Sequence, residues 1–331
     1  MANKKTALMS NRRDFDITVN PATTYAGEQA LPYVTAAVKS NDTIAKGFVR
    51  QMDGLTSKAV ISSLNTTDPI VAAACAFNDA GTTTLGERVL TVTDLKVNRE
   101  VCRKTLYPTW VGKNMTQNGG LPASFEDFLL QVVAGQASAQ IENGIWVADA
   151  GGIFGAGFLS DDGVFDQNGL NASATADFTQ VTMNGGAAID AANIDTALSA
   201  VYNSVVANHP GLEFKQGFGF YMNNKTFSFY QQYLAGVGAG QGVNLASLTL
   251  DSQTRYLGYP VYRCPGMPDD AIVATYTDNL VVGSNLGTDM LEASLIPTYM
   301  YDGSDNIRVV MNFGLGVQSG IGTDGVVGCI F

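Results

Sequence analysis

One long segment without charged residues constrains the fold of this chain more than any other feature. From Ser124 to Asp149, apolar residues recur at helical spacing, and Ser124 can form a capping box with Asp127. If the segment is helical throughout, it is about 39 Å long, because a helix rises about 1.5 Å per residue. No charged residue lies between Asp127 and Glu142. The side away from the apolar stripe carries small and amide side chains: Gln131, Gly135, Gln136, Ala137, Ser138, Ala139 and Gln140.

That charge-free side predicts a surface in contact with other protein, because a surface helix of a monomeric soluble protein normally presents charged residues to water. The contact could be with a second chain or with another part of the same domain. Composition agrees, since charged residues make up 15% of the 331 residues and hydrophobic residues 46%, whereas typical globular chains are roughly 25% charged. Low charge with ordinary hydrophobicity indicates either surface hidden by partners or a large, loop-rich β content.

Charge and cysteine content exclude several classes of protein. The net charge of −11 argues against a dedicated nucleic-acid-binding protein, which needs clustered lysine and arginine to neutralise phosphates. The cysteines form no Cys-x-x-Cys pair, so neither a zinc site nor a disulfide framework is expected. The first residues lack the apolar core of a signal peptide, and no apolar run of about 18 residues exists to span a membrane. We therefore expect a protein made in the cytoplasm, with free thiols.

Helical and strand patterns follow one another irregularly, which predicts an α+β fold without a regular βαβ rhythm. Residues 46–64 contain scattered apolar residues that are expected to pack on the body of the protein. Residues 65–90 predict a long β-hairpin with its tip near Asp79–Gly81 and too few large apolar residues for a core of its own. The other expected elements are helices at 27–39, 191–206 and 224–234, a flexible glycine loop at 236–242, and strands at 88–101, 218–222, 256–264, 271–276, 280–282, 291–299 and 307–318.

No group of residues in the sequence forms a catalytic or metal-binding pattern. The single histidine, His209, stands before Pro210 and Gly211 in an expected turn, and no Gly-x-Ser-x-Gly elbow is present. The glycine run at 236–242 lacks the Lys-Ser/Thr of a P-loop and does not lie between a strand and a helix. The turn at 302–306 alternates oxygen ligands but has no glutamate at calcium-loop spacing. We therefore expect no catalytic residues, no cofactor, no metal and no enzymatic activity.

Short motifs in a particular order resemble one known family. In Phe218–Thr226 a strand runs into Met-Asn-x-Lys-Thr at a helix start. Leu-Gly-Tyr-Pro-Val-Tyr follows at 257–262, then Met267-Pro and a strand pair from Ala271 to Val282. Behind a long helix and a hairpin, this order is similar to that of the major capsid proteins of tailed bacteriophages, which have the Hong Kong 97-type shell fold. The resemblance runs from about residue 46 to the end of the chain.

The resemblance implies a Hong Kong 97-like α+β fold built from an N-terminal arm, an extended loop, a peripheral domain with a long spine helix, and an axial domain. The extended loop, a β-hairpin, would lie over a neighbouring subunit. The implied boundaries are 1–45 for the arm, 65–87 for the extended loop, 46–64, 88–184 and 288–318 for the peripheral domain, and 185–287 and 319–331 for the axial domain.

The resemblance also implies which residues contact neighbouring copies. Some family members crosslink a lysine of the extended loop to an asparagine, but residues 65–90 contain no lysine, so this crosslink is not expected even though Asn306 matches the asparagine. The candidates are Asp79, Ala80, Gly81 and Thr82 at the extended-loop tip, Asp302, Gly303, Ser304, Asp305 and Asn306 at a threefold tip, and Gly236, Gly238 and Gly240 in a loop at the capsomer axis.

In function, the resemblance implies a structural subunit that assembles as hexamers and pentamers into an icosahedral shell. The shell would enclose double-stranded DNA without sequence-specific binding, with portal and scaffolding or decoration proteins as partners and no membrane. The protein would assemble in the host cytoplasm and end in the virion capsid.

Two alternatives remain open at this point. One is an encapsulin-like nanocompartment shell protein, which uses the same fold to enclose a cargo enzyme. The more distant one is a hydrolase with an unrecognised site that uses His209. Neighbouring genes for terminase, portal and protease would favour the phage, and a ferritin-like or peroxidase gene would favour the compartment.

Overall fold

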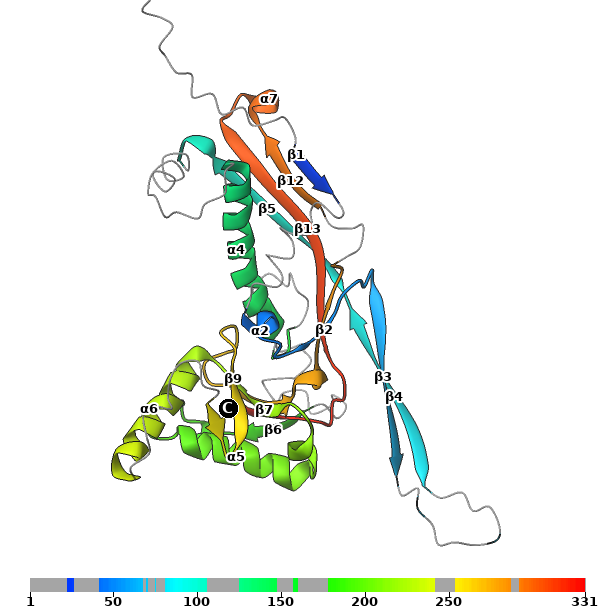
Figure 1. Cartoon of the computed structure of the whole chain (residues 1–331), viewed down its shortest axis with the longest axis vertical. Helices are drawn as coiled ribbons and strands as arrows, with labels where there is room; N and C mark the ends of the chain where they lie inside the picture. The colour runs from blue at the N-terminus through cyan, green and yellow to red at the C-terminus, as the bar shows by residue number, and fades with distance from the viewer. Residues whose placement is uncertain are drawn as a thin grey trace, which may run out of the picture.

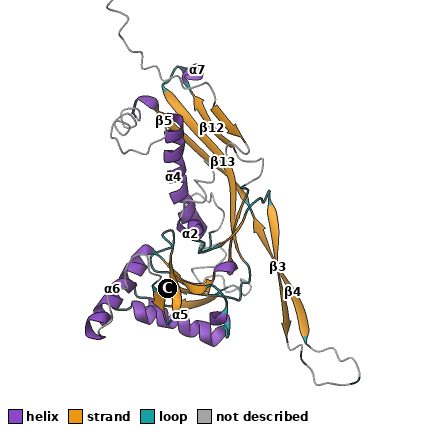
Figure 2. Cartoon of the chain, viewed as in Figure 1, coloured by secondary structure: helices purple, strands orange, loops and turns teal. Residues whose placement is uncertain are grey.

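The chain forms two β-sheets, each covered by helices, and a hairpin that projects from the first sheet (Figure 1). Helices and strands are both abundant and are interleaved along the chain, as the α+β prediction requires (Figure 2). The computed structural model describes residues 23–26, 42–67, 70, 75, 81–105, 125–147, 157–159, 178–241, 254–286 and 292–330.

The first sheet is organised by its longest strand, β13 (Asn306–Ser319). One edge of β13 pairs antiparallel with β5 (Thr93–Cys102). Along its other edge, β13 pairs with β12 (Glu292–Pro297) and then with β11 (Leu280–Ser284), so three strands pair with β13. The strand order is β1-β12-β13-β11-β2, with β5 on the other edge of β13, where β1 is Thr23–Ala26 and β2 is Arg50–Met52.

The long helix predicted from the sequence is α4 (Phe125–Trp146), and it lies along the first sheet (Figure 1). Residues 124, 148 and 149 of the expected helix lie outside the described residues. Alternate side chains of β13 are buried beneath the helix, because successive strand residues point to opposite faces of a sheet. The apolar contact comprises Phe128, Leu129, Val133, Ile141 and Ile145 of α4 with Ile307, Val309, Met311 and Phe313 of β13.

A buried carboxylate ties α4 to the rest of the molecule. Glu142 accepts hydrogen bonds from the backbone N–H of Thr43 at 3.1 Å, from the Thr43 hydroxyl, and from the N–H of Gly266 at 3.4 Å. Thr43 lies in the short helix α2 (Asp42–Ala45), and its hydroxyl also accepts a bond from the indole N–H of Trp146 at 3.1 Å. These bonds compensate for the burial of Glu142, which without partners would be costly.

The second sheet has the order β6-β14-β10-β7-β9-β8 and is covered by helices α5 (Ile194–Asn208) and α6 (Asn224–Gln241). Its central strand β7 is buried on both faces: Phe220 packs towards α5 and α6, whereas Tyr221 packs on Trp146 of α4. The sheet's strands are β6 (Thr179–Thr182), β7 (Phe218–Met222), β8 (Arg255–Tyr256), β9 (Tyr259–Arg263), β10 (Ile272–Tyr276) and β14 (Val326–Cys329).

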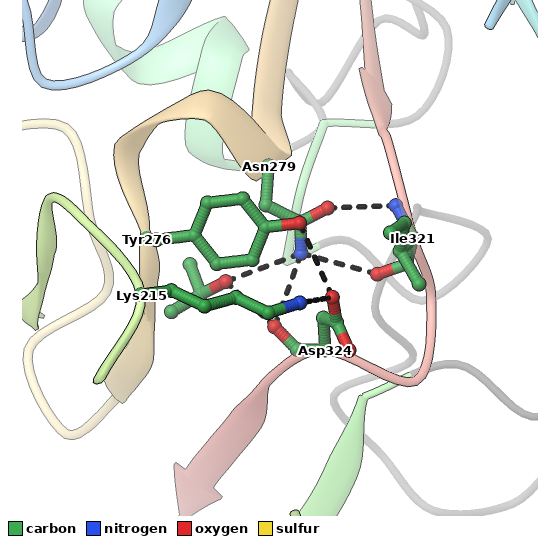
Figure 3. A network of polar contacts seen from close by, with 6 residues as sticks. Lys215, Tyr276, Asn279, Ile321 and Asp324 are labelled. Atoms are coloured by element: carbon green, nitrogen blue, oxygen red, sulfur yellow. Dashed lines mark hydrogen bonds and ion pairs between the residues drawn. The ribbon is translucent and has the colours of Figure 1, made fainter. Parts of the chain in front are cut away.

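Two segments that connect the sheets meet at Asn279, which is fully buried (Figure 3). One segment runs from β10 to β11, and the other runs from β13 to β14. The amide nitrogen of Asn279 lies 3.1 Å from the hydroxyl of Thr275 and from the carbonyl oxygens of Ile321 and Asp324, so its two hydrogens are shared among three acceptors. Its amide oxygen accepts the N–H of Ile321 at 2.7 Å. One side chain therefore fastens two of the connections between the sheets.

Two of the predicted strands are divided in the structure. The expected strand at 88–101 breaks at the buried residue Val92, whose N–H donates to the carbonyl oxygen of Ser57 at 2.8 Å. The expected strand at 256–264 breaks into β8 and β9 at a tight turn, where Leu257 and Gly258 have φ of 48° and 89°. A turn with positive φ is not expected at a leucine, because leucine rarely adopts this conformation. The sequence pattern therefore predicts a continuous strand where the structure has a turn.

Candidate interaction surfaces

The projecting hairpin consists of β3 (Lys58–Thr67) and β4 (Thr82–Thr91), paired antiparallel over their full length (Figure 1). It begins at Lys58, seven positions before the expected start at residue 65, which lies inside β3. The prediction that all of 46–64 packs on the body is therefore wrong for Val60 and Leu64, which lie on the hairpin and are 59% and 70% exposed. Val60 and Leu64 lie on the same face of a strand, but their hydrophobicity alone does not determine whether that face is buried.

One face of the hairpin carries an exposed apolar ladder. Val60 lies opposite Val89 and Leu64 lies opposite Leu85 in the strand register, and Leu85 and Val89 are 63% and 47% exposed. Side chains at alternate positions of paired strands share a face, so these four point the same way. Full burial of each would contribute about 1.5 to 3 kcal/mol. We call these four residues the apolar ladder.

The base of the hairpin is fastened to the first sheet. Leu90 is completely buried, and the guanidinium of Arg88 donates to the hydroxyl of Ser319 at 2.7 Å. The side-chain amide of Gln318 donates to the carbonyl oxygen of Val89 at 3.2 Å. A lone two-stranded hairpin is marginally stable in water, so this base is needed to hold the ladder in place.

The predicted contact residues at the hairpin tip are only partly described. Asp79 and Ala80 lie outside the described residues. Gly81 has φ of 84° and is exposed, and Thr82 begins β4 and is also exposed. The apolar ladder lies along the strands rather than at this tip.

The second predicted contact, at residues 302–306, lies at the end of β12 and β13 beside the short helix α7 (Tyr299–Asp302) (Figure 1). Gly303 has φ of 69° and ends the helix. Asp302 accepts the N–H of Ser304 at 2.9 Å, and Asp305 pairs with Arg103 at 3.4 Å. These polar groups shape the turn, and their contact with a neighbouring copy stays a prediction.

Asn306 and Arg308 at the same end are also engaged within the chain. The amide of Asn306 donates to one oxygen of Glu100 at 2.6 Å, and Arg308 donates to the other at 2.9 Å. Arg308 and then Asn306 lower the pKa of Glu100 through these hydrogen bonds. Two large side chains at this end are exposed, Tyr299 at 50% and Tyr301 at 83%, and the sequence did not predict them as contacts. Exposed tyrosines are common anchors of protein interfaces.

The third prediction, a glycine loop, is wrong for residues 236–241. Gly236, Gly238 and Gly240 belong to the last turns of α6, and Gly242 lies outside the described residues. Glycine costs about 1 kcal/mol relative to alanine in a helix, but unlike proline it neither clashes with the preceding turn nor lacks an N–H. Glycines interleaved with other residues therefore weaken the helix without ending it.

The charge-free side of α4 is divided between the core and the surface. Ala137 and Ser138, expected on the open side, are buried. The exposed residues form one charge-free face. This face includes the large apolar residue Val132 as well as the expected small and amide side chains. The face comprises Gln131, Val132, Gly135, Gln136, Ala139, Gln140 and Asn143.

The chemistry around His209 does not form a catalytic relay. Its Nε2 lies 2.7 Å from the hydroxyl of Thr179, and partial burial lowers the pKa of the imidazole, with Asp324 opposing this shift. The Asp324 carboxylate, however, pairs with Lys215 and accepts the hydroxyl of Tyr276 at 3.2 Å (Figure 3). A triad needs the acid to orient the imidazole, and here the acid is bound elsewhere.

The described residues hold no other evident chemical centre. They contain no group of three or more His, Cys, Asp or Glu side chains placed to hold a metal ion. Cys264 is buried, and burial raises the pKa of its thiol well above the ordinary value, which disfavours the reactive thiolate. Across the helices that the structure describes, none combines the length and apolar character needed to cross a membrane.

The arrangement of sheets, long helix and projecting hairpin is similar to that of solved capsids. A chain of the satellite phage P4 procapsid, a structure that includes the size determination protein, aligns at TM-score 0.56 and 13% identity over 90% of each chain. The chain has the Hong Kong 97-type capsid fold.

Two further capsids support this conclusion. The capsid of the native GTA particle aligns with the chain at TM-score 0.54 and 13% identity, over 89% of this chain and 90% of the other. The capsid of Myoviridae phage XM1 aligns at TM-score 0.54 and 11% identity, over 88% and 92%. No protein-family model matches the chain, and neither does any curated protein. The sequence identity between this chain and these capsid chains is only 11–13%, which explains why only short motifs of the sequence resemble the family.

Proposed function

We propose that this chain is a major capsid protein, a structural subunit whose copies assemble as hexamers and pentamers into an icosahedral shell. The observation that carries the proposal is the apolar ladder on a hairpin that projects from a capsid fold. A monomer gains nothing from holding four large apolar side chains in water on a ribbon without a core. A neighbouring copy that covers the ladder accounts for their presence, and obligate interfaces of this kind commonly bury more than about 2,000 Å².

Other exposed surfaces fit repeated contact between copies. One is the charge-free face of α4, and another is formed by Tyr299 and Tyr301 of α7. Both helices lie beside the first sheet, away from the projecting part of the hairpin (Figure 1). Several separate patches suit a subunit that must contact different neighbours, because heterologous contacts use different surfaces on the two partners.

The enclosed material in this proposal is double-stranded DNA, bound without sequence specificity. The net charge of −11 keeps the genome from adhering to the wall, since like charges repel over a Debye length of about 8 Å. The role is structural and not enzymatic. Portal and scaffolding or decoration proteins would be partners, assembly would take place in the host cytoplasm, and the product would be the virion capsid.

The test is assembly of the purified chain, supplied with its scaffolding and portal proteins, followed by sedimentation and negative-stain electron microscopy. We expect closed particles of uniform diameter from the natural chain. The double variant Leu64→Asp/Leu85→Asp should remain folded but form few or no particles, because it places two carboxylates in the covered ladder.

The matched control is Asn65→Asp, which adds a carboxylate to the opposite, exposed face of the same strand. It should assemble like the natural chain. If the ladder variant forms normal shells, or if the natural chain stays monomeric with its partners present, the proposed role is wrong.

A further inference from the structure

A groove lies between β5 and α4, and it shares only Gln136 and Gln140 with the charge-free face of α4. Its volume is about 340 Å³, at the small end of the range for ligand-binding sites. Its floor is apolar, and exposed amide and basic side chains rise at its sides. The lining residues are Leu95, Lys96, Val97, Asn98 and Arg99 of β5, Val133, Gln136, Ala137, Gln140 and Ile141 of α4, and Phe313 of β13.

The main chain of β5 forms one wall of the groove. Five consecutive residues, 95–99, line it, although side chains of a strand alternate between faces. Consecutive lining residues therefore mean that the strand's own edge borders the groove. Among the described strands, β5 pairs only with β13, through its other edge. An unpaired strand edge beside a groove offers backbone N–H and C=O groups to an added strand.

The charge of the groove is opposite to that of the chain. Lys96 and Arg99 are exposed and have no salt-bridge partner among the described residues, and no carboxylate lines the groove. The chain as a whole carries a net charge of −11. Two cations and no anion therefore make this groove locally complementary to a carboxylate-bearing ligand.

We propose that this groove binds an extended, acidic peptide segment of another protein by strand addition to β5. Alternate side chains of the segment would enter the apolar floor formed by Val133, Ile141 and Phe313, and the carboxylates between them would lie on the face of β5 that carries Lys96. Arg99 lies on the other face of β5 and adds positive charge to the same groove. Nucleic acid fits less well, because binding a phosphate backbone needs more cations than Lys96 and Arg99 supply. A charged backbone also makes no favourable contact with an apolar floor. The proposal does not depend on shell formation by the chain.

The experiment measures binding of fluorescein-labelled synthetic peptides to the unassembled full chain by fluorescence anisotropy. A short peptide of alternating glutamate and valine should bind, and the same peptide with lysine for glutamate should not. Two N-methylated forms, one modified at the glutamates and one at the valines, test strand addition. At least one of them should bind about tenfold more weakly, because it cannot donate its N–H groups to β5.

Charge reversal locates the site. Lys96→Glu/Arg99→Glu should weaken binding of the glutamate-valine peptide about tenfold or more, because two attractions become repulsions. Lys58→Glu, an exposed change on the hairpin, is the matched control and should leave binding unchanged. The proposal is overturned if the groove variant binds as the natural chain does, or if both N-methylated peptides bind fully. It is also overturned if a double-stranded oligonucleotide binds through these cations and the acidic peptide does not.

Discussion

At the scale of the residue, Asn279 shows how one amide can join two sheets. Its two amide hydrogens are shared among three acceptors and its amide oxygen accepts one bond, and these contacts involve two of the segments that cross between the sheets (Figure 3). A buried polar group is stabilising only when it is fully hydrogen-bonded, and the loss of one partner leaves the others unsatisfied. Nothing in the local sequence Thr277-Asp278-Asn279 marks this residue, because its partners on the second segment, Ile321 and Asp324, lie more than 40 positions away.

We expect Asn279→Asp to lower the free energy of unfolding by about 2 to 5 kcal/mol, because a buried carboxylate would replace a donor that faces three oxygen atoms. Chemical denaturation monitored by circular dichroism measures this. The exposed change Asn65→Asp, with the same alteration in charge, should stay within about 0.5 kcal/mol of the natural chain. Equal stability of the two variants would show that the junction is not fastened by Asn279.

At the scale of the element, α4 combines a core helix and a contact surface in one segment. Phe128 and Ile145 are buried against the sheet, whereas Gln131 and Ala139 are exposed on a face without charge. Part of the missing charge thus reflects burial within the chain, as Ala137 and Ser138 show. The remaining exposed face is the part that other protein would cover.

We expect Ala139→Lys to reduce particle yield while changing the free energy of unfolding by no more than about 0.5 kcal/mol, as for an ordinary surface change. The physical reason is that a lysine in a covered interface must lose its hydration. Ala207→Lys on the exposed side of α5 is the matched control. Particle yields that are the same for the two variants would indicate that this face of α4 is open to water in the shell.

At the scale of the whole molecule, the hairpin is separable from the two cores. It contributes no side chain beyond Leu90 to the buried hydrophobic set among the described residues of β3 and β4, and the ladder faces water. Stability and assembly should therefore depend on different parts of the chain, because burial within the sheets stabilises the fold and burial between copies stabilises the shell.

Replacing residues 62–87 by Asn-Gly tests this separation, because Ile61 and Arg88 are paired and a two-residue turn can join them. The shortened chain should unfold within a few degrees of the natural chain by calorimetry, yet remain monomeric in sedimentation. Closed particles formed by this variant would show that the hairpin is not required between copies.

Local periodicity by itself determined the elements that follow one repeat. The helix at α4, the strand at β7 and the helix at α5 could be predicted because the spacing of their apolar residues depends only on backbone geometry. The resemblance to capsid proteins rested on such elements in order, and the fold agrees with it. Boundaries failed where conformation contradicted residue preference, as at Leu257, and where glycine did not end a helix, as at Gly236.

Only the tertiary structure decided which apolar residues are covered. Val60 and Leu95 are both large apolar residues of strands, but one is exposed on the hairpin and the other is buried beneath α4. The groove beside β5 and the junction at Asn279 likewise depend on segments that are distant in sequence. A side chain is buried only when other groups pack over it. A hydrophobic residue therefore indicates that some surface should cover it, but the sequence does not show whether that surface belongs to this chain or to another.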